Sequence, residues 1–160
     1  VSGFAGKNSG DREMVTVSSE SLEGTDPLKA TILLVGLQFC TVVIDVEKVK
    51  QINISNCKRC GVVFESAVVG VDITRSQNID LQGKGKFYNC DIDQSDSVKL
   101  YADRSNAANL TILTNGCPQP TTVIFLGGDE EEPFEGIIPA QYQTKFVNGQ
   151  LETTPVEHEG

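Results

Sequence analysis

Tryptophan is absent from this chain of 160 residues, histidine occurs once, and the 13 basic residues are outnumbered by 22 acidic ones. The formal charge of −9 argues against a general nucleic-acid-binding protein, because such a protein needs a basic surface to displace counterions from phosphate. The single histidine, His158, stands two residues from the end, where neither a metal ligand nor a general base is expected. Most triad and zinc-site chemistries therefore lack their commonest participant.

Long apolar runs and an even set of cysteines are also missing. The longest apolar stretch, residues 31–46, is interrupted by Gly36 and Gln38, so no membrane span is predicted. The five cysteines come without a signal-peptide pattern, which predicts free thiols in a cytoplasmic, reducing compartment. Residues 1–12 are expected to be a disordered arm or a remnant left by trimming or cloning.

Cys57 and Cys60 enclose Lys58 and Arg59 in a Cys-x-x-Cys motif. This spacing is typical of a zinc half-site, of a dithiol redox pair, or of a corner in which cysteine packs as a small apolar residue. No second such motif and no histidine lies nearby, so zinc would lack half of its ligands. No helix N-terminus is predicted to stabilise a thiolate. The corner interpretation is therefore favoured, and no metal is expected.

Apolar–x–apolar units recur in two registers, at the nearly constant interval that separates Ile54, Ile73 and Ile92. The period of two within each unit and the many β-branched residues predict strands with one buried face, and no helical pattern competes. The first register contains Leu33/Val35, Ile52/Ile54, Val71/Ile73, Cys90/Ile92 and Leu110/Ile112. The second contains Val42/Ile44, Val62/Phe64, Ile79/Leu81, Val98/Leu100 and Val123/Phe125, and its last step is lengthened by the proline-bearing loop 115–120.

Short strands that return at a fixed interval are typical of coils stacked on one another. We predict an all-β fold, namely a right-handed parallel β-helix of about six coils. The hand follows from the general bias of parallel crossovers. An antiparallel sandwich with frequent turns is the alternative.

The segment Asn56-Cys57-Lys58-Arg59-Cys60-Gly61-Val62-Val63-Phe64 resembles the C-terminal domain of cyclase-associated proteins, in which Asn-Cys-Lys-Lys-Leu-Gly-Leu-Val-Phe is usual. The resemblance covers residues 13–160, with further matches at 68–70, 83–86, 126–129, 139–144 and 148–154. It implies a parallel β-helix that forms a homodimer by exchanging a C-terminal β-hairpin. It also implies a cytoskeleton-associated protein that binds monomeric actin, preferably with ADP, and sequesters it or promotes its nucleotide exchange. It implies no enzymatic activity and no cofactor, and the usual leucine at Cys60 makes the Cys-x-x-Cys motif incidental.

Asn148-Gly149 is the strongest turn signal, because both central positions of a type I′ turn need positive φ. The hairpin predicted around it is marginal alone, so it either pairs with a second chain or folds back on its own coil. The resemblance favours exchange, with residues 13–127 as the β-helix and 128–160 as linker and dimerisation hairpin. The expected dimerisation residues are Tyr142, Lys145, Phe146, Val147, Asn148, Gly149 and Leu151.

The tail departs from the usual family pattern in three ways. The hairpin is one residue shorter after Gln150, Pro155 is expected to interrupt the final strand, and Glu157-His158-Glu159 is unusually polar. Because the resemblance places this tail near the bound actin, these departures bear on nucleotide exchange.

Basic residues are predicted to gather on two edges of the β-helix. Lys48, Lys84, Lys86 and Arg104 follow strands of the second register, whereas Lys58, Arg59 and Arg75 follow strands of the first. Because actin is acidic, either edge could orient the domain, and the sequence does not decide between them. The candidate actin-binding residues are Lys48, Lys58, Arg59, Arg75, Lys84 and Lys86.

Two other functions stay open. A GTPase-activating protein related to tubulin-binding cofactor C would share the architecture, but the stretch 92–97, which corresponds to its arginine-bearing segment, has no arginine. Arg75 and Arg104 are weaker candidates for that role. Outward Asp72 and Asp91 could serve a polysaccharide-cleaving enzyme, although the chain has no room for its large loops. The acidic run 129–132 is expected to be a solvated linker.

Overall fold

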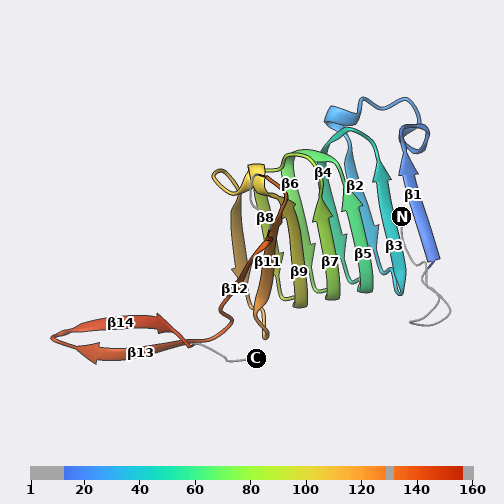
Figure 1. The fold of residues 1–160 in the computed structure, drawn as a ribbon. Helices are drawn as coiled ribbons and strands as arrows, with labels where there is room; N and C mark the ends of the chain where they lie inside the picture. Colours follow the sequence, from blue (N-terminus) through green and yellow to red (C-terminus); the bar gives the residue numbers. More distant parts are fainter. Residues whose placement is uncertain (1–12, 129–131, 157–160) are drawn as a thin grey trace.

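The computed structural model describes residues 13–128 and 132–156 as a β-helix of two sheets and a separate hairpin (Figure 1). The seven-stranded sheet has the order β1 (Glu13–Ser18), β3 (Cys40–Asp45), β5 (Lys58–Phe64), β7 (Gln77–Gly83), β9 (Asp96–Asp103), β11 (Thr121–Leu126) and β12 (Phe134–Ile138). The five-stranded sheet has the order β10 (Thr111–Asn115), β8 (Asn89–Asp93), β6 (Ser66–Thr74), β4 (Lys48–Ser55) and β2 (Thr31–Val35).

The chain alternates between the two sheets, so that each strand from β1 to β9 pairs in parallel with the strand two strands later. The exception is β12, which closes the seven-stranded sheet by pairing antiparallel with β11 and which lies in the segment expected to be a linker. Short 3₁₀ segments occur at η1 (Ser19–Leu22), η2 (Pro27–Lys29) and η3 (Arg104–Asn106). The predicted all-β parallel β-helix is confirmed, and the antiparallel sandwich is wrong. The predicted arm 1–12, the acidic residues 129–131 and the tail 157–160, with His158, lie outside the described residues.

The core is built of columns in which one inward position repeats from strand to strand. In the five-stranded sheet, Ile54 of β4 pairs with Ile73 of β6, which pairs with Ile92 of β8, and all three are buried. Since neighbouring strands are ~4.8 Å apart, these side chains pack directly on one another. Burying such an aliphatic side chain contributes about 1.5–3 kcal/mol, so each column stabilises the stacking of successive coils.

Two alignments predicted in the first register are wrong. Leu33 and Val35 are expected to face the core, but they are 51% and 38% exposed. Ile32 and Leu34 face inward instead, because the partner of Ile52 is Ile32 and not Leu33. A shift of one residue turns every side chain of a strand to the other face. At the other end, Ile112 pairs with Cys90, two positions away from the predicted alignment with Ile92.

Two alignments in the second register are also wrong, each by two positions. Val62 pairs with Leu81 and not with Ile79, whose inward partner is Cys60. The final alignment differs in the same way, because Val123 pairs with Leu100 and not with Val98. Cys60 is hard to recognise as a core position because a cysteine carries a weak apolar signal, although it packs as a small hydrophobe.

Phe64 lies opposite a glycine, which explains why the predicted alignment fails at that point. Phe64 pairs with Gly83, and the rings of Phe64 and Phe87 meet edge to face with centroids 5.1 Å apart. A Cβ atom at Gly83 would lie 2.7 Å from Phe64 Cζ and closer still to Phe87 Cε1. The two rings therefore occupy the space that a side chain at position 83 would need.

We predict that Gly83→Ala lowers the free energy of unfolding by about 1–3 kcal/mol, because a methyl group would overpack this site. The change is measured as the shift of the urea midpoint. In Phe64→Leu/Gly83→Ala the smaller side chain leaves room for the methyl group, so the double variant should lose less than the sum of the two single variants. Additive losses would mean that the Phe64 ring does not set the cost.

The corner between the two sheets contains two left-handed residues, three positions apart, in each of three successive coils. Asn56 and Arg59 have φ values of 53° and 53°, and the pairs Arg75/Asn78 and Gln94/Ser97 repeat this geometry. The inward residue that follows the first left-handed position is Cys57, Ser76 or Ser95.

These inward residues are linked from coil to coil by hydrogen bonds. The Cys57 N–H donates to Ser76 Oγ at 3.1 Å, and the Ser76 N–H donates to Ser95 Oγ at 3.1 Å. Cys57 and Cys60 are 0% and 1% exposed, so the corner interpretation of the Cys-x-x-Cys motif is confirmed.

Candidate functional site

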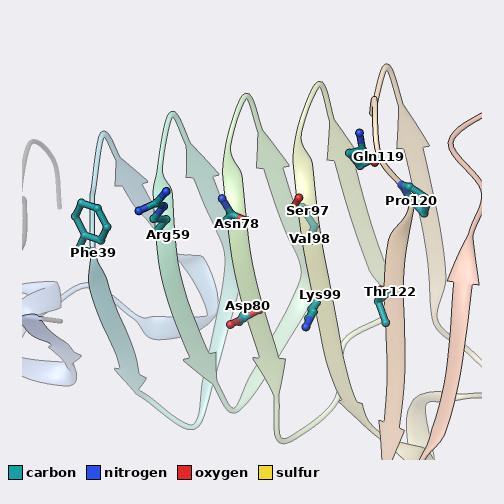
Figure 2. A pocket seen from close by; sticks show the side chains of 10 residues that line it. All are labelled: Phe39, Arg59, Asn78, Asp80, Ser97, Val98, Lys99, Gln119, Pro120 and Thr122. Atoms are coloured by element: carbon teal, nitrogen blue, oxygen red, sulfur yellow. The ribbon is translucent and has the colours of Figure 1, made fainter. Parts of the chain in front are cut away.

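A hollow of about 580 Å³ follows the corner and the adjoining face of the seven-stranded sheet (Figure 2). We call it the Arg59 groove, and its lining includes Phe39, Arg59, Asn78, Asp80, Ser97 and Lys99. The lining residues form two rows across the strands (Figure 2). One row contains the left-handed corner residues, and the other contains the outward positions Asp80, Lys99 and Thr122, which are direct neighbours in register.

Arg59 is the best-positioned cation of the groove. Its guanidinium carbon lies 5.4 Å from the centroid of the Phe39 ring, within the range of a cation–π interaction. Phe39 and Arg59 occupy equivalent left-handed positions in successive coils, each with a φ of 53°. Stacking thus restrains the Arg59 side chain while its guanidinium remains available for a carboxylate.

The predicted edge of Lys58, Arg59 and Arg75 exists as one corner of the β-helix. Lys58 begins β5 directly before Arg59, and Arg75 stands in the corner of the next coil. All three side chains are exposed. Whether they bind actin stays a prediction.

The second predicted edge is divided between different surroundings. Lys48 and Lys86 line a hollow of about 240 Å³ with Val68 and Tyr88, which are 51% and 46% exposed. Lys84 lines another hollow, of about 250 Å³. This edge therefore combines cations with an exposed apolar surface.

Arg104 is engaged within the chain. Its Nε donates to the Gly127 carbonyl at 3.1 Å and its Nη2 donates to the Glu132 carbonyl at 2.8 Å. These bonds tie the end of β11 to the start of the segment that leads into β12. Arg104 therefore has a structural role and contributes less to a basic edge than the sequence indicates.

The predicted terminal hairpin is confirmed as β13 (Tyr142–Val147) and β14 (Gln150–Pro155), which project away from the β-helix (Figure 1). Asn148 and Gly149 have φ values of 49° and 81°, as a type I′ turn requires. One face carries Tyr142, Phe146 and Leu151, which are 56%, 74% and 75% exposed. Lys145 and Val147 alternate to the other face.

Pro155 does not interrupt the final strand, contrary to the prediction. It is the last residue of β14 and pairs with Tyr142, and the following Val156 N–H donates to the Gln141 carbonyl at 2.8 Å. In an antiparallel ladder the hydrogen-bonded and non-hydrogen-bonded pairs alternate. Tyr142–Pro155 is therefore a non-hydrogen-bonded pair, in which a missing proline N–H leaves the ladder intact.

The outward carboxylates Asp72 and Asp91 are direct neighbours on β6 and β8. Burial and the adjacent Asp91 raise the pKa of Asp72, although the hydrogen bond from Gln51 opposes this shift. Gln51 Nε2 donates to Asp72 Oδ2 at 2.7 Å and to Asn53 Oδ1 at 2.9 Å. The pair is thus part of a hydrogen-bonded polar column.

The buried thiols contribute packing and local hydrogen bonds. Cys57 Sγ and Cys60 Sγ interact, and this hydrogen bond lowers the pKa of Cys57 to about 7 and raises that of Cys60. Burial raises the pKa of Cys90 to about 12. Within residues 13–128 and 132–156, no group of three His, Cys, Asp or Glu side chains is arranged to hold a metal ion. No helix in these ranges has the length and hydropathy needed to cross a bilayer.

The family model for the C-terminal region of adenylate cyclase associated (CAP) proteins matches residues 12–158. The chain belongs to the CAP C-terminal family. It is 30% identical over 114 residues to cyclase-associated protein 1 of Arabidopsis thaliana, with 71% of this chain and 24% of the relative covered. It is 31% identical over 110 residues to adenylyl cyclase-associated protein 2 of Homo sapiens, with 69% and 22% covered.

The chain thus spans about a quarter of the length of these CAP relatives. The crystal structure of cyclase-associated protein from Cryptosporidium parvum has the same fold, with a TM-score of 0.75 and 20% identity. That match covers 96% of this chain and 87% of the solved chain.

Most residues that line the groove of this CAP domain are not among the candidate residues predicted above, although the sequence contains a signal for them. Phe39, Arg59, Asn78 and Ser97 follow one another at nearly the same interval as the apolar units. Apolar spacing and basic charge do not select Phe39, Asn78, Asp80 or Ser97. Lys99 is basic but lies within β9, whereas the basic residues predicted above follow strands. Extending the repeat to polar positions would have placed the corner residues in one row.

We predict that Asp72→Asn stabilises the domain at neutral pH and has little effect near pH ~2, where carboxylates are protonated. The folded state raises the pKa of Asp72, so it binds more protons than the unfolded state between the ordinary and raised values. The contribution of Asp72 to stability is therefore most favourable below this pH range and falls as the pH rises through it. An asparagine retains an acceptor for Gln51 without the charge. Urea midpoints across pH test this, with the exposed Asp45→Asn as control, and a neutral-pH loss in Asp72→Asn would contradict it.

Proposed function

We propose that this CAP C-terminal domain binds monomeric actin in the cytoplasm, with a preference for the ADP-bound form, and thereby regulates filament turnover. The observation that carries the proposal is the family match over residues 12–158, together with a fold shared along 96% of the chain. The domain acts by binding and performs no chemistry on a substrate. Its basic corner on a chain of charge −9 would orient it toward an acidic partner.

The same domain is proposed to form a homodimer by exchange of its hairpin. Tyr142, Phe146 and Leu151 expose an apolar face on a hairpin that would be marginal by itself. The β-helix also has an uncovered surface, because β10 is the terminal strand of the five-stranded sheet and its Leu113 is 61% exposed. A second copy of the chain could cover both surfaces symmetrically.

The first experiment is a titration of fluorescently labelled monomeric actin, in its ADP and ATP forms, with the purified domain. We expect tighter binding to ADP-actin, because the family role that the proposal carries over is the recycling of spent monomers. Release of a fluorescent nucleotide from the same samples separates recycling from sequestration. Absence of binding to both forms would contradict the proposed function.

For the dimer, Phe146→Ser/Leu151→Ser should raise the dissociation constant by about tenfold or more, because it removes the apolar face. Gln143→Ser/Thr154→Ser is the matched control, since these two residues also form a cross-strand pair of the hairpin but lie on its other face. Light scattering over a range of protein concentrations gives the constants. Equal behaviour of the two variants would rule out the apolar face as the dimer contact.

A further inference from the structure

We infer that the Arg59 groove is the surface of the β-helix that receives actin, and that it takes an extended acidic segment carrying a basic residue. This inference deepens the proposed function and depends on it. It chooses between the two basic edges, which the sequence alone leaves equivalent. The groove is the larger hollow, at about 580 Å³ against about 240 Å³ for the hollow of Lys48 and Lys86.

The length of the groove suits an extended peptide segment. Its corner row runs from Phe39 on the rim of β3 to Pro120 before β11, which is four strand steps. At ~4.8 Å per step this is roughly 19 Å, the length of about six residues of extended chain at ~3.3 Å each. The rows lie across the strands, so such a segment would cross the five strands from β3 to β11.

The charges of the groove define the chemistry of its occupant. Arg59 lies in the corner row and Lys99 in the outward row, whereas Asp80 is the register neighbour of Lys99 (Figure 2). Two cations can pair with two carboxylates of the segment, and the exposed Asp80 can pair with a cation beside them. Asn78 and Ser97 lie between as hydrogen-bonding groups. The occupant is therefore an acidic segment that also carries a lysine or arginine.

Arg59 is prepared for this contact before the partner arrives. The Phe39 ring restrains its guanidinium, and the left-handed backbone of the corner fixes the direction of its Cα–Cβ bond. A restrained side chain loses less conformational entropy on binding than a free one. The planar guanidinium can also bind a carboxylate through two parallel hydrogen bonds, which a lysine cannot do.

The opposite edge is less suited to a carboxylate-bearing segment. Lys48 and Lys86 frame the exposed side chains of Val68 and Tyr88, so that hollow favours an apolar ligand. Arg104, the arginine of that predicted edge, is already bonded to the carbonyls of Gly127 and Glu132.

The test compares two charge-reversed variants for binding to ADP-actin. Arg59→Glu/Lys99→Glu alters the groove, and Lys48→Glu/Lys86→Glu alters the opposite edge with the same change in net charge. We expect the groove variant to bind about tenfold or more weakly and the control to remain within about threefold of wild type. Urea midpoints verify that both variants are folded.

Two milder variants refine the assignment. Arg59→Lys retains the charge without the planar stack on Phe39, and we expect an intermediate loss of affinity. Asp80→Asn should weaken binding if the segment contains a cation, whereas tighter binding would overturn that part of the inference. These variants do not depend on the larger disturbance of charge reversal.

The outcomes separate the inference from the proposed function. If wild type binds actin and both double variants weaken equally, the effect is one of net charge and the groove assignment is overturned. A loss confined to Lys48→Glu/Lys86→Glu would place actin on the opposite edge, with the proposed function intact. If wild type binds neither form of actin, the proposed function fails and the groove inference fails with it.

Discussion

The parallel pairing of equivalent strands, one coil on the next, is the constraint on which the rest of this domain depends. Ile54, Ile73 and Ile92 occupy one inward position in three successive coils and are buried against one another. The same register that stacks these side chains inside also stacks their neighbours outside. Asp80, Lys99 and Thr122 are aligned on the surface because Leu81, Leu100 and Val123 are aligned in the core.

At the corners, the same register determines which side chains are exposed and in which direction they leave the backbone. A left-handed conformation costs a residue other than glycine roughly 1–2 kcal/mol, yet Arg59, Asn78 and Ser97 all adopt it. Asn56 and Arg75 occupy the other left-handed position of these corners, where backbone hydrogen bonds hold one coil to the next: the Asn56 N–H donates to the Thr74 carbonyl at 3.1 Å and the Arg75 N–H donates to the Asp93 carbonyl at 3.0 Å. The inward serines Ser76 and Ser95 add further acceptors. Side chains at these corners therefore leave the backbone in a direction that the fold determines.

The elements that could be predicted from the sequence are those with a strong local signal. The period of two and the return of apolar pairs predict the β-helix, and Asn148-Gly149 predicts the hairpin turn. The register of the strands was harder to predict, because it depends on which residue of each strand is the first to face inward. Cys60 fills such a position with a weak apolar signal, and Gly83 fills one with no side chain at all, since two phenylalanine rings occupy its space.

The groove was harder still, since its residues share a location without sharing a chemistry. Phe39, Arg59, Asn78 and Ser97 have an aromatic, a cationic, an amide and a hydroxyl side chain, and only their backbone geometry is common. Neither a charge cluster nor a short motif groups them. What unites them is the coil interval, so the repeat of the fold is also the best guide to its surface.

The end of the β-helix links this surface to the hairpin. Burial declines in the last coil, where Ile112 and Phe125 are only partly covered and Leu113 is exposed, although β12 closes the seven-stranded sheet. A solenoid needs a cap at each end, because its terminal coil has no neighbour to complete its core. In the proposed dimer the exchanged hairpin supplies the missing cover beside β10. Since the groove extends to Gln119 and Thr122 of this same coil, dimerisation would support actin binding by ordering one end of the groove.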